Sequence, residues 1–273
     1  MFKTNVQRLS LGRIYDIRIR VEFVSRPITV ISRHEELELK LDAEKLILYH
    51  YPATRSVRAR WALLETVGSA FELKTVDLYG GDQYSSEFLK LNPNHNVPAL
   101  EIHWRDGSVQ VMLESSAIVS WLADAYPDQE LAPAITSHAS RAEYLKWLHF
   151  GASWTDMMLW QIRAHRHILS PEDSDPNTIS RYENKFRNEC EPQVAAQLEK
   201  TDFILGGQFT AADIIIGHNV FWARAYGLCQ AEIFEVYVNR LMLRPSLQIA
   251  LDDISEFSLE PAIDAPVREK FTG

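Results

Sequence analysis

The sequence predicts a small α/β domain with a mixed sheet followed by an all-helical domain, and two observations carry this prediction. Over residues 45–126, short strand-like runs and helical patterns follow one another in the order β-α-β-α-β-β-α. Beyond a proline-containing linker at 127–137, almost every segment has helical periodicity. We therefore expect a helical-bundle domain at 138–260, with a poorly ordered basic extension at 1–44 and a loose tail at 261–273.

Four apolar runs are the predicted strands. They are LILYHY (46–51), FELKTVDL (71–78), VPALEIH (97–103) and SVQVML (108–113). The first two are joined through a helical pattern, which favours a parallel pair with a right-handed crossover. The last two are joined by WRDG, whose Asp-Gly step is typical of a hairpin. One parallel pair and one hairpin make a mixed sheet.

Three long patterns define the helical half. Residues 140–168 form one continuous helical pattern, and a second pattern at 178–200 should bend or stop near Pro192. A third pattern, at 210–227, is apolar along nearly its whole length, which indicates a buried helix. It begins with Thr210-Ala-Ala-Asp213, the spacing of a capping box, for which we expect a structural role.

The composition limits the function. The net charge of −9 argues against a nucleic-acid surface, and no apolar run reaches the eighteen residues of a membrane span. The two cysteines, Cys190 and Cys229, match no metal-site spacing and suggest a reduced compartment. We expect a cytoplasmic protein. The basic, acid-poor composition of residues 1–34 is typical of a mitochondrial transit peptide, but its RIRVEFV run is β-prone.

Four short segments, in this order and spacing, carry a resemblance to a known family. They are LNPNHNVPAL (91–100), LESSAI (113–118), FTAADIII (209–216) and LRPSLQIAL (243–251). They resemble the NPxGKVPxL, ESxAI, F-[ST]-x-A-D-I and RPxxxxA segments of the cytosolic glutathione transferases. The resemblance covers about residues 45–257. It implies a thioredoxin-like first domain, glutathione as co-substrate, no metal, and a homodimer.

The resemblance also assigns a glutathione-binding set. It implies a cis bond between Val97 and Pro98, with the Val97 backbone pairing with the cysteinyl backbone of glutathione. Asn96 stands where the family often has lysine, so it can donate a hydrogen bond to the glycyl carboxylate but supplies no charge. Ser115 would bind the γ-glutamyl carboxylate at a helix N-terminus and cap that helix, and Glu114 would accept from the γ-glutamyl ammonium.

The turn PATRS is where the thiol would lie. A free thiol has a pKa of about 8.5, and an O–H donor aimed at the sulfur favours the thiolate. The family uses Ser, Tyr or Cys here in different classes, and this turn has no cysteine. Aligning Arg58 with the arginine of the family's RVxxAL helix puts Thr54 near the usual serine. Ser56, which should cap the helix, the phenol of Tyr51, and backbone N–H groups alone are the alternatives.

The second substrate should lie between the domains, against the long helical pattern. The candidate pocket residues are Trp154, Met157, Met158, Gln161 and His165. Aromatic and Met side chains suit a broad apolar site, although such a stripe on a helix is also typical of a core. His165 and His167 point to different faces and indicate no metal site.

Three functions fit these observations. In the first, the protein adds the glutathione thiolate to an electrophilic, apolar small molecule, as in detoxification or secondary metabolism. In the second, it is a glutathione-dependent isomerase or a biosynthetic tailoring enzyme with a narrow pocket. In the third, it is a non-catalytic interaction module, a role in which the fold also serves. The Glu114–Ser115 pair argues against the third function.

Overall fold

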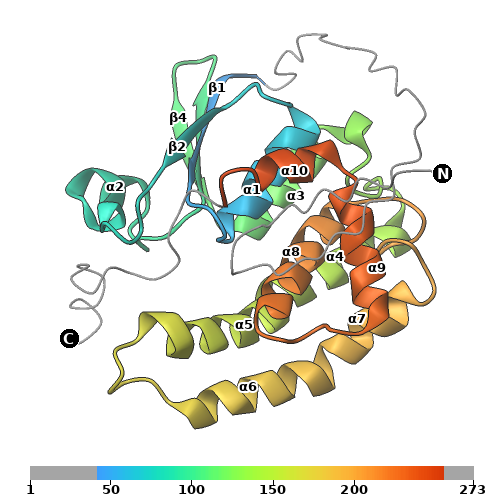
Figure 1. Ribbon diagram of the computed structural model, residues 1–273. Helices are drawn as coiled ribbons and strands as arrows, with labels where there is room; N and C mark the ends of the chain where they lie inside the picture. Colours follow the sequence, from blue (N-terminus) through green and yellow to red (C-terminus); the bar gives the residue numbers. More distant parts are fainter. Residues whose placement is uncertain (1–41, 255–273) are drawn as a thin grey trace, which may run out of the picture.

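The computed structural model describes residues 42–254, and it places a four-stranded sheet beside a layer of helices (Figure 1). The predicted tail at 261–273 and almost all of the predicted extension lie outside these residues. The extension was expected to run to residue 44, but the first strand already begins at Ala43.

The sheet has the strand order β2-β1-β3-β4. Its strands are β1 (Ala43–His50), β2 (Glu72–Thr75), β3 (Ala99–Trp104) and β4 (Val109–Leu113). Strand β1 pairs in parallel with β2 and antiparallel with β3, and β3 and β4 form an antiparallel hairpin. The prediction of a thioredoxin-like mixed sheet is therefore confirmed.

Helices cover both faces of this sheet. The helices of this half are α1 (Ser56–Thr66), the short α2 (Ser86–Leu91) and α3 (Ser115–Ala125), with single 3-10 turns at Asp82–Tyr84 and Pro127–Gln129. Helices α1 and α3 pack against each other on one face, where Trp61 and Ile118 are fully buried. On the other face, Phe88 of α2 contacts the ring of Tyr49 edge-on, with ring centroids 5.9 Å apart.

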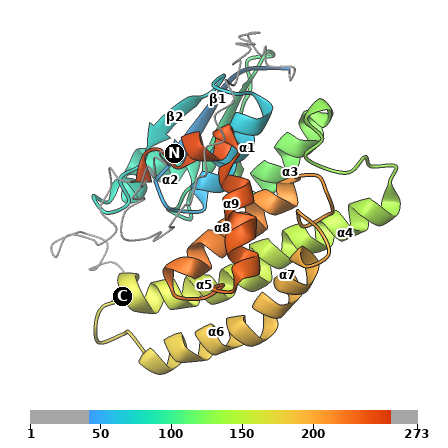
Figure 2. The ribbon, with the colours of Figure 1, turned by 45° about the vertical axis from the view of Figure 1, so that its right-hand side comes forward.

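The helical half begins with one long helical rod. The predicted pattern at 140–168 is α4 (His138–His149), a π-helical stretch (Phe150–Thr155), α5 (Asp156–Arg163) and a second π-helical stretch (Ala164–Ile168). Helix α6 (Pro176–Glu189) lies along the outer side of α5 (Figure 2). It ends before α7 (Glu191–Leu198), whose first turn contains Pro192, so the predicted break at this proline is confirmed.

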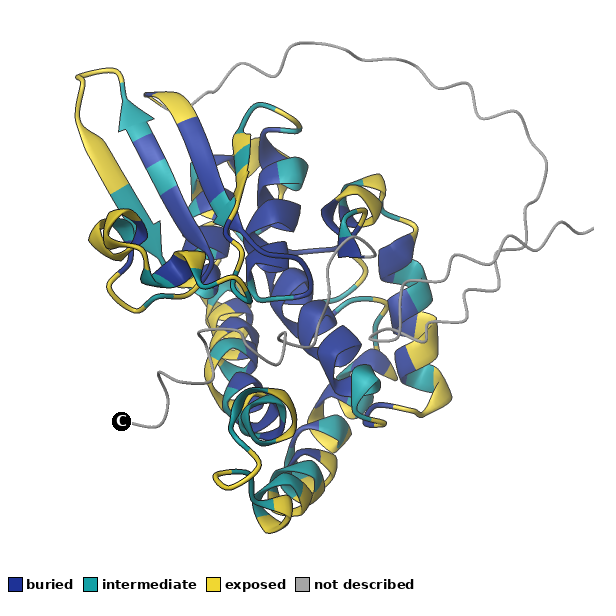
Figure 3. Ribbon diagram, turned by 60° about the vertical axis from the view of Figure 1, so that its left-hand side comes forward, coloured by how far each residue is buried: buried dark blue, intermediate teal, exposed yellow. Residues whose placement is uncertain are grey.

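Helix α8 (Ala211–Ala225) is the centre of this half, with α9 (Glu232–Met242) beside it, and α10 (Pro245–Ala250) packs against α1 and α9. It is buried from Ala211 to Ala223, and Figure 3 shows buried residues concentrated where helices meet one another and the sheet. Even so, no helix within residues 42–254 is long and apolar enough to cross a membrane.

The capping box predicted at the start of α8 is present. Asp213 accepts from the backbone N–H groups of Thr210 and Ile204 and from the Tyr237 hydroxyl, at 2.8–2.9 Å. Burial raises the pKa of this carboxyl to about 6. Gly151 lets the π-helical stretch approach α8, because a Cβ there would lie 2.6 Å from a methyl carbon of Ile215.

Candidate active site

The ends of three strands meet at one edge of the sheet. Tyr49 lies opposite Ala99, and Ala99 lies opposite Leu113. The turn after β1, the Pro98 segment before β3 and Glu114 after β4 therefore sit side by side, at the edge that faces the helical half (Figure 1). The topology brings together the residues that the resemblance assigns to glutathione.

The segment before β3 offers backbone groups. The Val97–Pro98 bond is cis, as the resemblance implies. Within residues 42–254, neither the N–H nor the C=O of Val97 has a hydrogen-bond partner. The neighbouring Asn96 is exposed, and its side-chain and backbone oxygens both accept from the Asn92 amide at 2.8 Å. Asn92 thus holds the oxygens of Asn96 inward and leaves its amide N–H groups available to a ligand.

The segment after β4 ends in an unusual backbone conformation. Glu114 has φ of 70°, in the left-handed region that a residue with a Cβ adopts at a cost of about 1–3 kcal/mol. Its carboxylate is exposed, directly before the positive end of α3. Strain of this kind accumulates at ligand-binding sites, where it fixes the direction of a side chain.

Ser115 differs from its expected role as a cap. Helix α3 begins at Ser115 itself, its N-cap is Glu114, and no side-chain cap hydrogen bond is made. The Ser115 hydroxyl instead accepts from Nη1 of the buried Arg58 at 3.4 Å. Its own hydrogen is not used in that contact, so the hydroxyl can still donate to an anion at the helix end.

Thr54 lies partly exposed in the turn between β1 and α1. Its hydroxyl donates to the Tyr51 carbonyl at 2.7 Å and lies 2.8 Å from the Ser56 hydroxyl. It also accepts from the Ser56 backbone N–H at 3.3 Å. These contacts fix the position of the oxygen while one side of the residue stays open to solvent.

Ser56 also differs from its expected role as a cap. It is the first residue of α1, its exposed fraction is 0%, and the N-cap position belongs to Arg55. The Ser56 hydroxyl contacts the Tyr51 N–H and C=O at 3.1 and 2.9 Å and Nδ1 of His50 at 2.8 Å. It therefore fastens the end of β1 to the start of α1, and its burial keeps it from direct contact with a ligand.

Tyr51, the third hydroxyl candidate, is 2% exposed. Its ring packs edge-on against Tyr79 with ring centroids 5.7 Å apart, in a small cluster with Val76 and Val97. Burial raises the pKa of the phenol above its ordinary value of 10. The structure therefore leaves Thr54 as the one of the three candidates whose side chain reaches the surface.

A charged cluster beneath this turn was not anticipated. Arg58 is fully buried, and it donates to both carboxylate oxygens of Asp156 at 2.9 and 2.6 Å and to the amide oxygen of Asn219. Arg55 donates to the same carboxylate at 2.9 Å. Burial opposes the ionisation of Asp156, but Arg58 and Arg55 hold the pKa of its carboxyl below the usual value. Two guanidinium groups against one carboxylate leave net positive charge under the turn.

His218 of α8 ties the turn to the helical half. Its Nε2 lies 3.0 Å from the carbonyl oxygen of Thr54, so this nitrogen carries the proton and donates. Burial and the nearby Arg58 guanidinium lower the pKa of His218 well below 6.5, which keeps the ring neutral. The backbone of Thr54 is thereby positioned by a residue of the second half.

Comparisons with known proteins identify the family. The sequence model described as "Glutathione S-transferase, N-terminal domain" matches residues 44–124. Glutathione S-transferase GstA of Escherichia coli O157:H7 is 30% identical over 75% of this chain and 96% of its own length. Glutathione S-transferase theta-3 of Mus musculus is 34% identical over 82% of this chain and 95% of its own.

The chain belongs to the glutathione S-transferase family.

Solved structures of the family agree with the fold. A glutathione transferase from Burkholderia graminis, with two glutathione molecules bound per subunit, superposes with a TM-score of 0.65 at 26% identity, over 77% of this chain and 88% of its own. A sphingomonad glutathione S-transferase complexed with glutathione gives the same TM-score at 25% identity, over 77% and 98%. The family and these complexes support glutathione binding and transfer at the level of the family.

The residues expected to hold the second substrate are not all on one surface. Met158 is 0% exposed and packs in the core, with its sulfur 3.8 Å from that of Cys190, so it does not line an open pocket. His165 accepts from the backbone N–H of Asp175 through Nδ1 and so holds the loop before α6. Trp154 is 40% exposed, with the Lys185 ammonium 4.8 Å from its ring centroid.

The other candidate pocket residues, and one tryptophan that was not a candidate, lie on α5. Met157 and Gln161 of α5 are partly exposed. Trp160, which sequence reasoning did not single out, is 38% exposed, and the Arg55 guanidinium lies 5.1 Å from its ring centroid and 5.2 Å from that of Trp222. In this glutathione S-transferase, Arg55 thus links the turn to the aromatic side chains of α5 and α8.

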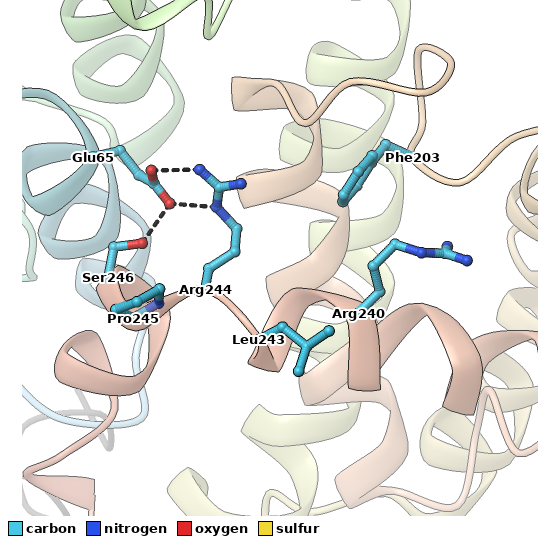
Figure 4. A pocket seen from close by; sticks show the side chains of 7 residues that line it. All are labelled: Glu65, Phe203, Arg240, Leu243, Arg244, Pro245 and Ser246. Carbon is cyan, nitrogen blue, oxygen red and sulfur yellow. Dashed lines mark hydrogen bonds and ion pairs between the residues drawn. The ribbon is translucent and has the colours of Figure 1, made fainter. Parts of the chain in front are cut away.

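A hollow elsewhere on the molecule is not part of this site. It has a volume of about 500 Å³ and is lined by Glu65, Phe203, Arg240, Leu243, Arg244, Pro245 and Ser246 (Figure 4). Glu65 is at the opposite end of α1 from Thr54, and it accepts from Arg244 through both oxygens at 2.6 Å. The other charged residue of the lining, Arg240, pairs with Asp202 at 2.8 Å. Because its charged groups are already paired, the hollow is a structural anchor for α10 and not a glutathione site.

Proposed function

We propose that this protein binds glutathione at the sheet edge and transfers it to an electrophilic, apolar small molecule. In this proposal, the Thr54 hydroxyl turns from the Tyr51 carbonyl when glutathione binds and donates its hydrogen to the sulfur. The Val97 backbone pairs with the cysteinyl unit, Asn96 binds the glycyl carboxylate, and Glu114 and Ser115 bind the γ-glutamyl end. The observation that best supports the proposal is that Thr54 is partly exposed at the end of the sheet where these groups lie close together.

The size of the effect is reasonable for one hydroxyl. A thiol with a pKa of about 8.5 needs roughly 1.4 kcal/mol of selective stabilisation for each unit of lowering. A hydrogen bond to a charged group contributes about 1.5–3 kcal/mol. The Thr54 hydroxyl therefore accounts for a lowering of about one to two units, and the positive charge of the Arg55–Arg58–Asp156 cluster acts in the same direction.

The electrophile is assigned to the face of α5 beside the turn. Trp160 presents partly exposed apolar surface there, with the Arg55 guanidinium 5.1 Å from its ring centroid, and Met157 is partly exposed on the same helix. Met side chains adapt to ligands of different shape. Both cysteines are free and buried, and burial raises the pKa of the Cys190 thiol to about 12. The reactive thiol in this proposal is therefore that of glutathione.

The proposal is tested by incubating the protein with glutathione and a panel of generic electrophiles. We expect saturable glutathione binding and conjugates whose mass is the sum of the two reactants for addition, or that sum less the expelled acid HX for electrophiles that carry a leaving group X. Binding without any product would favour an isomerase, a narrow tailoring enzyme or an interaction module. The absence of saturable binding would contradict the proposal.

We also propose that the protein is a homodimer in the cytoplasm. Light scattering coupled to size-exclusion chromatography tests the first statement, and twice the chain mass of 31.4 kDa is the expected result. Imaging of a C-terminally tagged chain tests the second. Accumulation in mitochondria would instead indicate that the basic N-terminal residues act as a transit peptide.

A further inference from the structure

A chain of four side chains leads inward from the exposed hydroxyl of the turn. Thr54 Oγ1 lies 2.8 Å from Ser56 Oγ, and Ser56 Oγ lies 2.8 Å from Nδ1 of His50. On the other side of the ring, Nε2 of His50 lies 3.1 Å from a carboxylate oxygen of Asp253, which follows α10. His50 is 0% exposed, so the chain crosses the protein interior from the thiol turn to the end of the helical half.

The carboxylate at the inner end of this chain determines which nitrogen of His50 carries the proton. The Asp253 carboxylate can only accept, so Nε2 of His50 carries the proton. Burial lowers the pKa of His50 despite the opposing effect of Asp253, and the ring is neutral at pH 7. Its Nδ1 is then an acceptor and can take the hydrogen of Ser56, when the Ser56 hydroxyl turns from the Tyr51 carbonyl toward the ring. The Thr54 hydroxyl, which otherwise donates to the same carbonyl, can then turn and donate to Ser56 Oγ. Thr54 Oγ1 keeps lone pairs with which it can accept from a donor outside.

The charged groups beside the His50 ring act in opposite directions on a second proton. Arg60 pairs with Asp252 at 2.9 Å and with Asp253 at 2.8 Å. The Asp253 carboxylate favours a second proton on His50, whereas burial and the Arg60 guanidinium oppose it. The imidazolium would hydrogen-bond at both nitrogens, to Ser56 and to Asp253.

We propose that the His50–Asp253 pair receives the thiol proton of glutathione through Thr54 and Ser56. The proposal rests on the proposed function. The thiol gives its proton to Thr54 Oγ1, Thr54 gives its own to Ser56 Oγ, and Ser56 gives its own to Nδ1 of His50. Each hydroxyl loses one hydrogen and gains one. The products are a thiolate that accepts from Thr54 and an imidazolium paired with Asp253, and the total charge is unchanged.

The reversed chain holds the thiolate as well as forming it. After transfer, His50 donates to Ser56, Ser56 donates to Thr54, and Thr54 donates to the sulfur. Hydrogen bonds aligned in one direction polarise and strengthen one another. The relay thus explains why a fully buried serine and histidine stand behind the one hydroxyl that can reach the ligand.

This relay makes a measurable difference to the proton balance of binding. A hydroxyl that only stabilises the thiolate leaves the thiol proton to the solvent, so one proton is released for each thiolate formed. Transfer to His50 keeps the proton in the protein. At pH 7 the number of thiolates formed then exceeds the number of protons released, by up to one per site.

The test compares these two numbers for the full chain. Ultraviolet absorbance gives the thiolate formed, and titration calorimetry in buffers of different ionisation enthalpy gives the protons released. S-methylglutathione, which has no ionisable thiol, gives the proton count of all other groups, and this count is subtracted. We expect an excess of thiolate over protons in the wild type and equal numbers in His50→Asn, which keeps an acceptor near Nδ1 but no basic nitrogen.

Two further variants make the result specific. Ser56→Ala interrupts the relay and leaves the His50–Asp253 pair in place, so it should also give equal numbers even if His50→Asn does not fold. His103→Asn removes another histidine–carboxylate pair, with Glu101 on β3, and should keep the wild-type excess. Equal numbers in the wild type would overturn the relay alone. No saturable glutathione binding, or no thiolate, would overturn the proposed function with it.

Discussion

The thiol turn and the neighbouring face of α5 are built in opposite ways. In the turn, the hydroxyls of Thr54 and Ser56 are held by two or more partners each. Arg58, through Asp156, and His218 bind the turn to the helical half. On α5, Met157 and Trp160 present partly exposed apolar surface that no hydrogen bond holds within the described residues. One region is suited to hold the same atom in the same place, and the other to accept molecules of different shape.

The difference is one of energy as well as geometry. Ser56, Arg58 and His218 are buried with their partners, so that loss of one partner leaves another group buried and unpaired. The face of α5 loses only contact area when a side chain is shortened. Substitutions should therefore have large effects on the turn and small ones on α5, and the following predictions test this ordering.

The largest effect is expected from Asp156→Ala. The change leaves Arg58 buried without its carboxylate, and breaking a buried pair in this way costs about 3–5 kcal/mol of unfolding free energy. Denaturant unfolding measures this loss. Asp124→Asn, which removes a surface pair with Arg141, is the matched control and should cost about 1 kcal/mol or less. Equal losses in the two variants would show that the buried cluster does not hold the halves together.

The next effect is expected from Glu114→Gln. The proposed contact with the γ-glutamyl ammonium is a hydrogen bond to a charged group, which is worth about 1.5–3 kcal/mol. Glutathione affinity should fall roughly tenfold to hundredfold by titration calorimetry. Glu87→Gln, a change at an exposed residue of α2, should leave it unchanged. If the two variants bind alike, Glu114 does not contact glutathione.

A third prediction concerns acid stability. The pKa of His218 is well below 6.5 in the folded protein, so between the two values the unfolded chain binds more protons than the folded one. The stability due to the neutral ring is complete above pH 6.5. It is lost as the pH falls below that value, by up to about 1.4 kcal/mol per pH unit.

His218→Gln tests this dependence, because its amide can still donate to the Thr54 carbonyl but does not titrate. Unfolding free energies measured from pH 7 to pH 5 should decline less steeply in the variant. His50 adds a decline of the same sign, since burial lowers its pKa too, so some slope should remain. Parallel profiles for the wild type and the variant would mean that His218 is not buried in the neutral form.

The smallest effect is expected on α5. Met157→Ala should raise KM for an apolar electrophile by roughly fivefold, about 1 kcal/mol of lost contact, without changing glutathione affinity. Val236→Ala, at an exposed residue of α9, should change neither. A large change in glutathione affinity in Met157→Ala would mean that the two regions are not separate.

Local patterns in the sequence predicted the fold and the backbone of the site. Strand alternation, the Asp-Gly hairpin and the capping box of Thr210 and Asp213 each depend on neighbouring residues, and each is confirmed. The roles of Ser56 and Ser115 as caps were wrong because each helix begins at the serine and not after it. A shift of one residue turned both hydroxyls toward other partners.

Other features depend on residues far apart in the sequence. Arg58 and Asp156 are 98 positions apart, and His218 and Thr54 are 164 apart, so no local pattern indicated their pairing. Over residues 140–168, periodicity predicted a helix but not which of its faces is buried and which is exposed. The structure places Met158 in the core and uses His165 to hold a loop, and the π-helical stretches on either side of α5 alter the register of its faces.

The central claim is that the Thr54 hydroxyl stabilises the glutathione thiolate. Its most direct test is a pH titration of thiolate absorbance for glutathione bound to the wild type, Thr54→Ala and Thr54→Ser. We predict that the pKa of the bound thiol rises by about one to two units in Thr54→Ala, through loss of one charge-assisted hydrogen bond, and stays near the wild-type value in Thr54→Ser. The same pKa in all three proteins would contradict the account.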